Sequence, residues 1–201
     1  MCIASLGMND TGLMPPQTTV PSTHAERLPL WVRSSQEFGL PIDAYVMLAI
    51  QQLGQAEDPL LAMEDTLAQQ YVSNPEPSID QGIKLMKCSA LSQYWVFGLY
   101  EMPRTSKQAA PALFAPVRSL FQKVEVARMP LAKYEVKSAP GYRNVPHYPT
   151  GLWSPETGQV GWHAFDPLRR EMMVVSRTAL ADEFLSLTGL EGRDQQTDLL
   201  A

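Results

Sequence analysis

Apolar residues recur at intervals of three and four along the middle of the chain, and this pattern predicts helices. Pro41 suits a first helical position, and the apolar residues that follow it at helical spacing continue to Leu53. Asp58 is typical of an N-cap, with Pro59 at the first position of a second helix. Residues 72–78 contain two prolines and predict a break.

The longest predicted helix opens at Ser78 and carries the clearest apolar stripe. Ser78 is followed three residues later by Gln81, which is the spacing of a capping box. Pro103 is expected to kink or end this helix. At about 100° per residue, one side of the helix is expected to face the core through seven residues: Leu85, Cys88, Leu91, Trp95, Val96, Leu99 and Met102.

A second long helix is predicted from about Pro111 to Val136, although Pro116 and Pro130 interrupt its pattern. Two long helices joined by a short linker are expected to pack antiparallel.

The pattern changes after residue 138. Residues 139–158 are rich in proline and glycine and predict a loop. A β-hairpin is predicted over residues 159–176, and a closing helix over residues 178–187. Alternation along the first hairpin strand places three residues on one side: Val160, Trp162 and Ala164.

These patterns predict a mainly α fold, a helical bundle of four or five helices with a C-terminal β-hairpin. Residues 1–29 are expected to form a flexible N-terminal tail because they lack periodic apolar positions. A single helical domain is expected over residues 30–190, followed by a flexible C-terminal tail over residues 191–201.

Composition narrows the class of protein. The 201 residues are 45% apolar, and 16 basic against 21 acidic residues give a net charge of −5, which disfavours binding to nucleic acid or anionic membranes in general. Cys2 and Cys88 are too few for a disulfide framework. The chain also shows neither a signal-peptide pattern nor a run of about 18 apolar residues. A cytoplasmic protein without membrane association is therefore expected.

The candidate binding surface lies on the longest predicted helix, opposite its apolar stripe. Tyr94, Phe97, Glu101 and Arg104 share this second face. A helix with aromatic residues on both sides is typical of one that lies between two partners, which favours a ligand or subunit interface. The alternative is a purely structural pair of Glu101 and Arg104 above a buried helix.

This stretch also resembles the HEPN helical domains. The resemblance covers about residues 41–136 and rests on Tyr94 and Trp95, then Tyr100 and Glu101 leading to Arg104, on a long helix paired with another. It implies an all-helical bundle of the kind found in toxin–antitoxin, defence and RNA-processing systems, which commonly dimerises.

Active HEPN members are metal-independent ribonucleases whose signature is an Arg and a His near a helix end, with about four to six residues between them. Neither Arg104 nor Arg128 is followed by a histidine in range, and the spacer from Arg143 to His147 is one residue too short. Cleavage at a ribose 2′-hydroxyl needs a proton acceptor poised near neutral pH, usually imidazole. The resemblance therefore implies a non-catalytic member.

An RNA-processing enzyme or RNA-binding protein of HEPN-like type is the alternative hypothesis. Residues 104–143 contain eight basic and two acidic residues, a net charge of +6, which leaves −11 for the rest of the chain. In this alternative Arg104 and Arg128 hold phosphates, assisted by Tyr100 or Lys133. The basic side chains point in different directions on a helical wheel, which favours a solvated helix instead.

The three histidines lie in different segments, and no Cys or His spacing predicts a metal site or any cofactor. A third hypothesis is a small-ligand pocket near Trp153, Trp162 and His163, between the loop and the hairpin.

The sequence thus favours a non-catalytic binding or regulatory module over an enzyme. It is expected to dimerise, or to dock a protein partner, through its long central helix, with RNA as a less favoured partner. The candidate partner- or ligand-binding residues are Tyr94, Phe97, Glu101, Arg104, Arg128 and Lys133.

Overall fold

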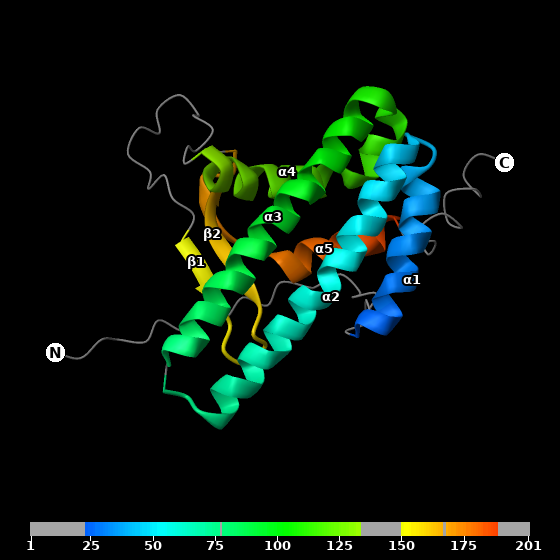
Figure 1. Ribbon diagram of the computed structural model, residues 1–201. Helices are drawn as coiled ribbons and strands as arrows, with labels where there is room; N and C mark the ends of the chain where they lie inside the picture. Colours follow the sequence, from blue (N-terminus) through cyan, green and yellow to red (C-terminus); the bar gives the residue numbers. More distant parts are fainter. Residues whose placement is uncertain (1–22, 77, 134–149, 167, 189–201) are drawn as a thin grey trace, which may run out of the picture.

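The computed structural model describes residues 23–76, 78–133, 150–166 and 168–188. These ranges contain five α-helices, one π-helical turn and a three-stranded antiparallel sheet (Figure 1). The predicted class, a helical bundle with a small β element near the C-terminus, is confirmed.

The first three elements form one side of the bundle. Helix α1 (His24–Ser34) continues into the π-helical turn η1 (Ser35–Gly39), and α2 (Ala44–Ser73) runs back alongside α1 (Figure 1). Asp43 caps α2 by accepting a hydrogen bond from the backbone N–H of Tyr45 at 2.6 Å.

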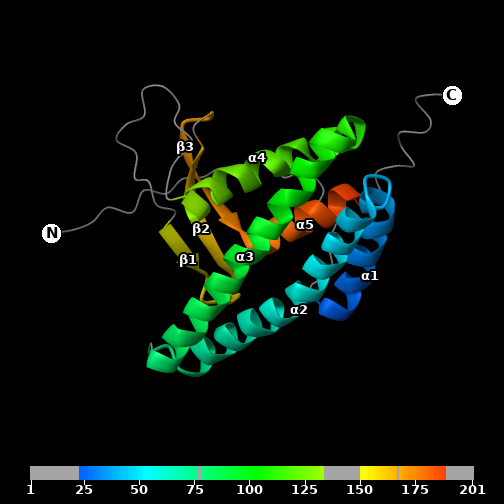
Figure 2. The same ribbon diagram turned by 45° about the horizontal axis from the view of Figure 1, so that its top comes forward.

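Helices α2 and α3 (Ile79–Ala109) form a long hairpin, and α4 (Pro111–Lys133) folds back along α3 after the single residue Ala110 (Figure 2). The predicted capping box is present, since Ser78 Oγ accepts from the N–H of Gln81 and the Gln81 side chain accepts from the N–H of Ser78. The predicted antiparallel packing is confirmed, because Gln93 of α3 donates to the backbone carbonyl of Leu131 near the end of α4 at 3.0 Å, whereas Tyr100, further along α3, stacks on the earlier residue Phe121 at 5.3 Å.

The sheet packs against α3 and α4, and α5 (Arg177–Thr188) closes the bundle against α1, α3 and α4. Its strand order is β1 (Thr150–Trp153), β2 (Val160–Asp166), β3 (Glu171–Ser176), and Trp162 pairs with Gly151 on one side and Val175 on the other. The alternation predicted for the first hairpin strand is confirmed, because its three inward residues are all buried: Val160, Trp162 and Ala164.

One continuous core joins the helices to the sheet. Trp31 of α1 lies at its centre, stacked on Phe184 of α5 at 5.3 Å and edge-on to Trp95 of α3 at 5.9 Å. Elements far apart in the sequence therefore share one aromatic cluster, which holds α1 and α5 against the α2–α3 hairpin.

Several expected boundaries are wrong. The tail expected over residues 1–29 is too long, because α1 begins at His24 and Arg27 is only 2% exposed. The sequence shows no apolar stripe at the start of this helix, since the buried residue there is a charged one, Arg27, held by ion pairs. No break separates Gly54 from Asp58, since α2 continues through Pro59. A proline removes only one hydrogen bond, and burial of the surrounding turns outweighs that loss.

Two further expectations need correction. Of the two effects expected of Pro103, a kink or an end, the end does not occur, because α3 continues to Ala109. Leu91, expected in the core, remains 38% exposed because it lies at the edge of the buried arc. The stretch predicted as loop over residues 139–158 contains β1 at its end, and a strand of four residues gives too short an alternation to recognise. The end of the predicted helix beyond residue 133 and the predicted C-terminal tail lie outside the described residues.

Candidate functional site

The four residues predicted to form a face on α3 do lie together. Tyr94 is 69% exposed and its ring contacts that of Phe97 edge-on, with centroids 6.3 Å apart. Phe97 is half-buried against the core. One turn further along, Arg104 donates to a carboxylate oxygen of Glu101 at 2.6 Å, and both side chains are about half exposed. The face is therefore aromatic at its centre and ionic at its end.

The other two predicted residues belong to α4, and one of them contacts α3. The Arg128 guanidinium lies over the ring of Tyr100, 4.6 Å from its centroid. Lys133 is the last residue of α4, and its side chain lies outside the described part of the structure. Arg128 thus joins α3 through an aromatic contact.

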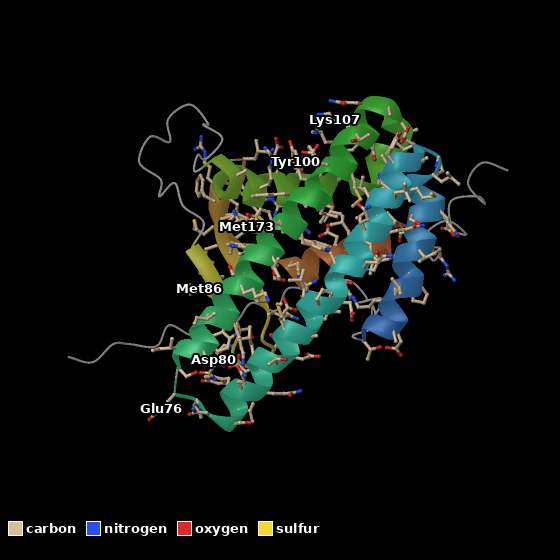
Figure 3. All side chains as sticks on the ribbon, in the orientation of Figure 1. Glu76, Asp80, Met86, Tyr100, Lys107 and Met173 are labelled. Atoms are coloured by element: carbon tan, nitrogen blue, oxygen red, sulfur yellow. The ribbon has the colours of Figure 1, made fainter. Side chains whose placement is uncertain are left out.

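The same face continues toward the start of α3, which sequence reasoning missed. Ile79, Ile83 and Met86 are 86%, 56% and 66% exposed, and Met86 marks this part of the helix in Figure 3. With the exposed Ala90 and three of the predicted residues they form what we call the α3 stripe: Ile79, Ile83, Met86, Ala90, Tyr94, Phe97 and Glu101. At 100° per residue all seven fall within about 80° of the helix circumference. The regular spacing of these seven residues was the feature of the sequence that could have predicted the whole stripe.

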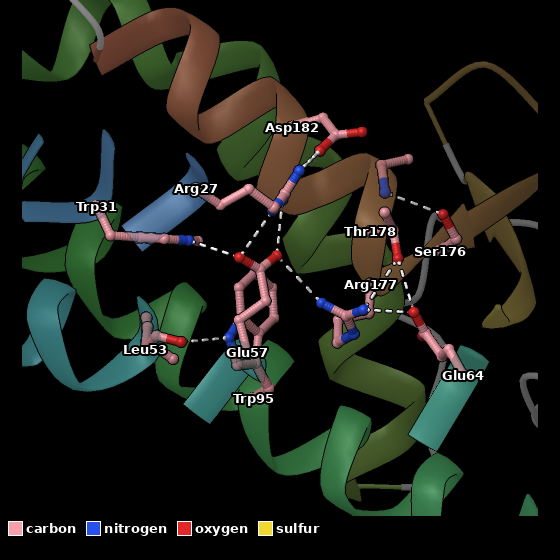
Figure 4. Close-up of polar contacts among 11 residues, drawn as sticks. Arg27, Trp31, Leu53, Glu57, Glu64, Trp95, Ser176, Arg177, Thr178 and Asp182 are labelled. Carbon is pink, nitrogen blue, oxygen red and sulfur yellow. Dashed lines mark hydrogen bonds and ion pairs between the residues drawn. The ribbon is translucent and has the colours of Figure 1, made fainter. Parts of the chain in front are cut away.

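A second candidate site, also missed from the sequence, is an ion cluster buried between α1, α2 and α5 (Figure 4). Its centre is Glu57, which is 0% exposed. The Glu57 carboxylate accepts two hydrogen bonds from Arg27, at 2.7 and 3.0 Å, and one from Trp31 Nε1 at 2.7 Å. A further bond comes from Arg177 at 3.2 Å. Both oxygens of this buried carboxylate therefore have charged or polar donors, as burial requires.

Two more acidic residues complete what we call the ion cluster: Arg27, Glu57, Glu64, Arg177 and Asp182. Arg177, itself fully buried, donates to Glu64 Oε2 at 2.6 Å, and Arg27 donates to Asp182 at 2.6 Å. Thr178 Oγ1 donates to the same oxygen of Glu64 at 3.3 Å. Three carboxylates face two guanidinium groups, so the cluster has one excess negative charge when all are ionised.

The charged groups of the ion cluster shift one another's pKa values. Burial alone lowers the pKa of Arg27, but hydrogen bonds and charge from Glu57 and Asp182 outweigh it and raise that pKa above its ordinary value. Burial raises the pKa of Glu64, and the nearby charge of Arg177 only partly offsets this effect. Glu64 therefore holds a proton more readily than an exposed glutamate does.

A sequence signal for this cluster did exist on α2. Seven of the eight buried residues of that helix repeat at alternating intervals of four and three, as in a heptad pattern: Val46, Ile50, Leu53, Glu57, Leu60, Glu64 and Leu67. Two of these seven inward positions are glutamates. A charged residue at an inward position is rarely buried without a partner, and here the partners come from α1 and α5.

A pocket of about 420 Å³ opens beside the ion cluster, between α2, α5 and the turn from β1 to β2. Its wall includes Glu64 and Asp65 of α2, Glu156 of the turn and Asp182 of α5. Gly158 presses this turn against α2 with φ at +68°, and a Cβ there would lie 1.8 Å from the backbone oxygen of Glu64. Only glycine allows this approach.

The residues predicted to line a small-ligand pocket, Trp153, Trp162 and His163, lie on β1 and β2, and residues 139–149 of the predicted loop lie outside the described residues. Trp162 is buried under the sheet, and the Trp153 ring contacts that of Tyr71 at 5.6 Å. None of the three residues lines the pocket beside the ion cluster, although that pocket does use the turn between their strands.

Comparison of the chain with protein-family models, with curated proteins and with solved structures finds no match. The HEPN resemblance therefore stays a prediction. In the described ranges no helix is both long and apolar enough to cross a membrane. Across those same residues, no group of three or more His, Cys, Asp or Glu side chains is arranged to hold a metal ion.

Proposed function

We propose that this chain is a non-catalytic helical module that forms a two-fold homodimer through the α3 stripe. The observation that carries the proposal is an exposed apolar face on a helix whose opposite face is already buried in the core. Side chains as large as Ile79, Met86 and Tyr94 are rarely left in water along one continuous stripe unless a partner covers them.

The stripe suits a second copy of itself. Its intervals are 4, 3, 4, 4, 3 and 4 residues, a sequence that reads the same in both directions about Ala90. A two-fold axis at Ala90 would place two antiparallel copies in register, with Ile83 facing Phe97 and Met86 facing Tyr94 of the other copy. The small, apolar side chain of Ala90 would let the two helices approach closely at the axis without burying a polar group.

Charges at the two ends of the stripe complement each other in this arrangement. Arg104 at one end would lie beyond Ile79 of the other copy, near the acidic residues Glu76 and Asp80 that flank the start of its α3. Glu76 and Asp80 are both exposed near the start of α3 (Figure 3). Antiparallel pairing would therefore bring a basic end against an acidic end twice, as electrostatic complementarity favours.

The expected affinity is modest. From Ile79 to Glu101 the stripe is about 33 Å long, which gives an interface at the small end of specific ones. The hydrophobic free energy gained by burying four large side chains can be scaled by the fraction of each that is now exposed. This gives about 5 kcal/mol per copy, or about 10 kcal/mol for both, from Ile79, Ile83, Met86 and Tyr94. Association itself costs roughly 4–15 kcal/mol, so a dimer that dissociates on dilution is expected.

The first experiment measures mass by light scattering over a wide range of protein concentrations. We expect a monomer–dimer equilibrium that Ile83→Glu abolishes, since two charges would be buried opposite Phe97. Leu48→Glu is the matched control, because Leu48 is 46% exposed on α2, outside the stripe. A monomer at every concentration, or a dimer unaffected by Ile83→Glu, would contradict the proposal.

A cysteine crosslink tests the register. Helix axes about 8–10 Å apart with Cα radii of about 2.3 Å put facing Cα atoms roughly 3.5–5.5 Å apart, which overlaps the range for disulfides of about 4.4–6.8 Å. Ala90→Cys in a Cys2→Ser chain is therefore expected to crosslink under oxidation. Cys88 does not interfere, because it is fully buried.

The matched control is Met86→Cys, which lies on the same stripe but eight residues from its own counterpart across the axis, about 12 Å away. It is expected to crosslink only when mixed with Tyr94→Cys. Equal crosslinking of Ala90→Cys and Met86→Cys would exclude the two-fold register.

The geometry favours this module over the RNA-binding alternative. Arg128 lies over Tyr100, so this proposed phosphate contact already has a partner in the protein, and the carboxylate of Glu101 beside Arg104 disfavours the approach of a phosphate. Lys123 likewise pairs with Glu183 at 2.7 Å. Absorbance at the nucleic-acid band on the same chromatography peak tests the alternative directly, and none is expected.

A further inference from the structure

The α3 stripe contains one methionine, Met86, whose side chain is open to solvent (Figure 3). Met86 is 66% exposed, whereas Met102 on the opposite face of α3 is 2% exposed. Side chains of a helix lean toward its N-terminus, so that of Met86 leans toward the turn that contains Gly82. A Cβ at Gly82 would meet nothing within 4 Å, so nothing crowds that side of Met86. A small solute can therefore reach the thioether in the free chain.

Dimerisation would cover the same side chain. The two-fold axis at Ala90 would place Met86 of one copy against Tyr94 of the other, whose ring contacts that of Phe97 edge-on at 6.3 Å. A thioether sulfur packs favourably beside aromatic rings. Met86 lies about one turn from the axis, so both copies would bury it near the middle of the interface. Its thioether is therefore accessible in the monomer and protected in the proposed dimer.

Oxidation by a peroxide would make this side chain polar. A lone pair of the sulfur attacks the O–O bond of hydrogen peroxide, one oxygen is transferred to sulfur, and the other leaves as water with both protons. Sulfur loses the two electrons that the peroxide gains, so no further reactant is needed. Against the ring carbons of Tyr94 and Phe97 the sulfoxide oxygen would lose its hydrogen bonds to water, which makes its burial unfavourable.

We propose that Met86 is an oxidation site that controls dimerisation: a peroxide converts it to the sulfoxide in the monomer, and the sulfoxide weakens association of the two copies. This inference rests on the proposed dimerisation through the α3 stripe. Because that dimer dissociates on dilution, the free chain exposes Met86, and its oxidation draws the equilibrium toward monomer by mass action. Reduction of the sulfoxide by a methionine sulfoxide reductase restores the apolar thioether and with it the dimer.

The first test follows oxidation of two methionines in one Cys2→Ser chain by peptide mass mapping after exposure to hydrogen peroxide. Met172 is the internal control, because it is 57% exposed on β3, outside the α3 stripe. At a protein concentration about ten times the Kd of the dimer, mass action leaves roughly a fifth of the chains monomeric. Oxidation of Met86 is therefore expected to be about fivefold slower there than in dilute protein. The rate at Met172 is expected to stay the same, and an equal change at both residues would overturn the proposal.

The second test measures the dimer by light scattering before and after oxidation. The Kd of the oxidised chain is expected to rise about tenfold or more, because each dimer would bury two sulfoxides. Met86→Leu keeps an apolar side chain of similar volume and is expected to dimerise equally well before and after peroxide treatment. Met172→Leu is the matched control variant, and its dimer is expected to weaken on oxidation as that of the parent chain does.

Failure of this inference is distinguishable from failure of the proposed dimer. A dimer that keeps its Kd after full oxidation of Met86 would overturn the oxidation site and leave the dimer in place. The same holds if the Met86→Leu dimer weakens after peroxide treatment, since the sensitive residue would then lie elsewhere. A chain that is monomeric at every concentration before any oxidation would instead overturn the proposed function, and this inference with it.

Discussion

The ion cluster makes a quantitative prediction about Glu57. Replacement of Glu57 by Gln keeps the size of the side chain but removes its charge. The new glutamine also places an amide N–H₂ group where, in the parent protein, a carboxylate oxygen accepts hydrogen bonds. Arg27, Trp31 and Arg177 all donate to Glu57 in the folded protein. After the change Arg27 keeps Asp182 as its charged partner and Arg177 keeps Glu64.

The expected cost follows from burial. Glu57 and both arginines are 0–2% exposed, so water cannot replace the lost partner. Removal of one member of a buried ion pair typically costs about 3–5 kcal/mol. Here the cost arises because the glutamine amide has only one acceptor oxygen, which leaves a buried N–H donor of Arg27, Trp31 or Arg177 without a partner. Glu57→Gln is therefore expected to lower the free energy of unfolding by about 3 kcal/mol or more, a large share of the stability of a typical domain.

The matched control is Glu101→Gln. Glu101 also accepts from an arginine, Arg104, at 2.6 Å, but both side chains are 49% exposed. Loss of an exposed pair is expected to cost about 0–1 kcal/mol. Urea unfolding followed by fluorescence of the core residues Trp31 and Trp95 measures both variants, with an unchanged m-value as the check on two-state behaviour. If the two variants differ by less than about 1 kcal/mol, the ion cluster does not stabilise the fold as argued.

Three further predictions concern glycine positions and Cys88. Gly54→Ala is expected to lower the unfolding temperature, because a Cβ there would lie 2.5 Å from Trp31 and strain outweighs the gain in helix propensity; Gly82→Ala on α3 meets no atom within 4 Å and should raise it. Burial raises the pKa of Cys88 to about 11, so folded protein should resist alkylation at Cys88 at pH 8, as peptide mass mapping would show. Because the unfolded thiol ionises near pH 9 and the folded one does not, stability should fall between pH 9 and 11 by up to about 3 kcal/mol relative to Cys88→Ala. Stabilisation by Gly54→Ala, or alkylation of Cys88 before unfolding, would contradict these expectations.

The helices and the candidate surface on α3 followed largely from local sequence. The capping box at Ser78, the inward alternation along β2 and the shared face of Tyr94 and Arg104 depend on residues within a few positions of one another. Backbone geometry converts such short spacings directly into caps and faces. The N-terminal half of the α3 stripe could have been predicted in the same way, since Ile83 and Met86 continue the spacing.

The ion cluster and its pocket depended on tertiary structure. Arg27 and Arg177 are 150 positions apart, and nothing in the sequence near either residue specifies that both donate to Glu57. The continuity of α2 through Pro59 was likewise decided by packing, which outweighed the local cost of proline. The sequence by itself determined that the middle of the chain is helical and which faces of those helices are apolar, because both depend on neighbouring residues. Only the tertiary structure decided which charges are buried together, because the partners of Glu57 and Glu64 arrive from helices at opposite ends of the chain.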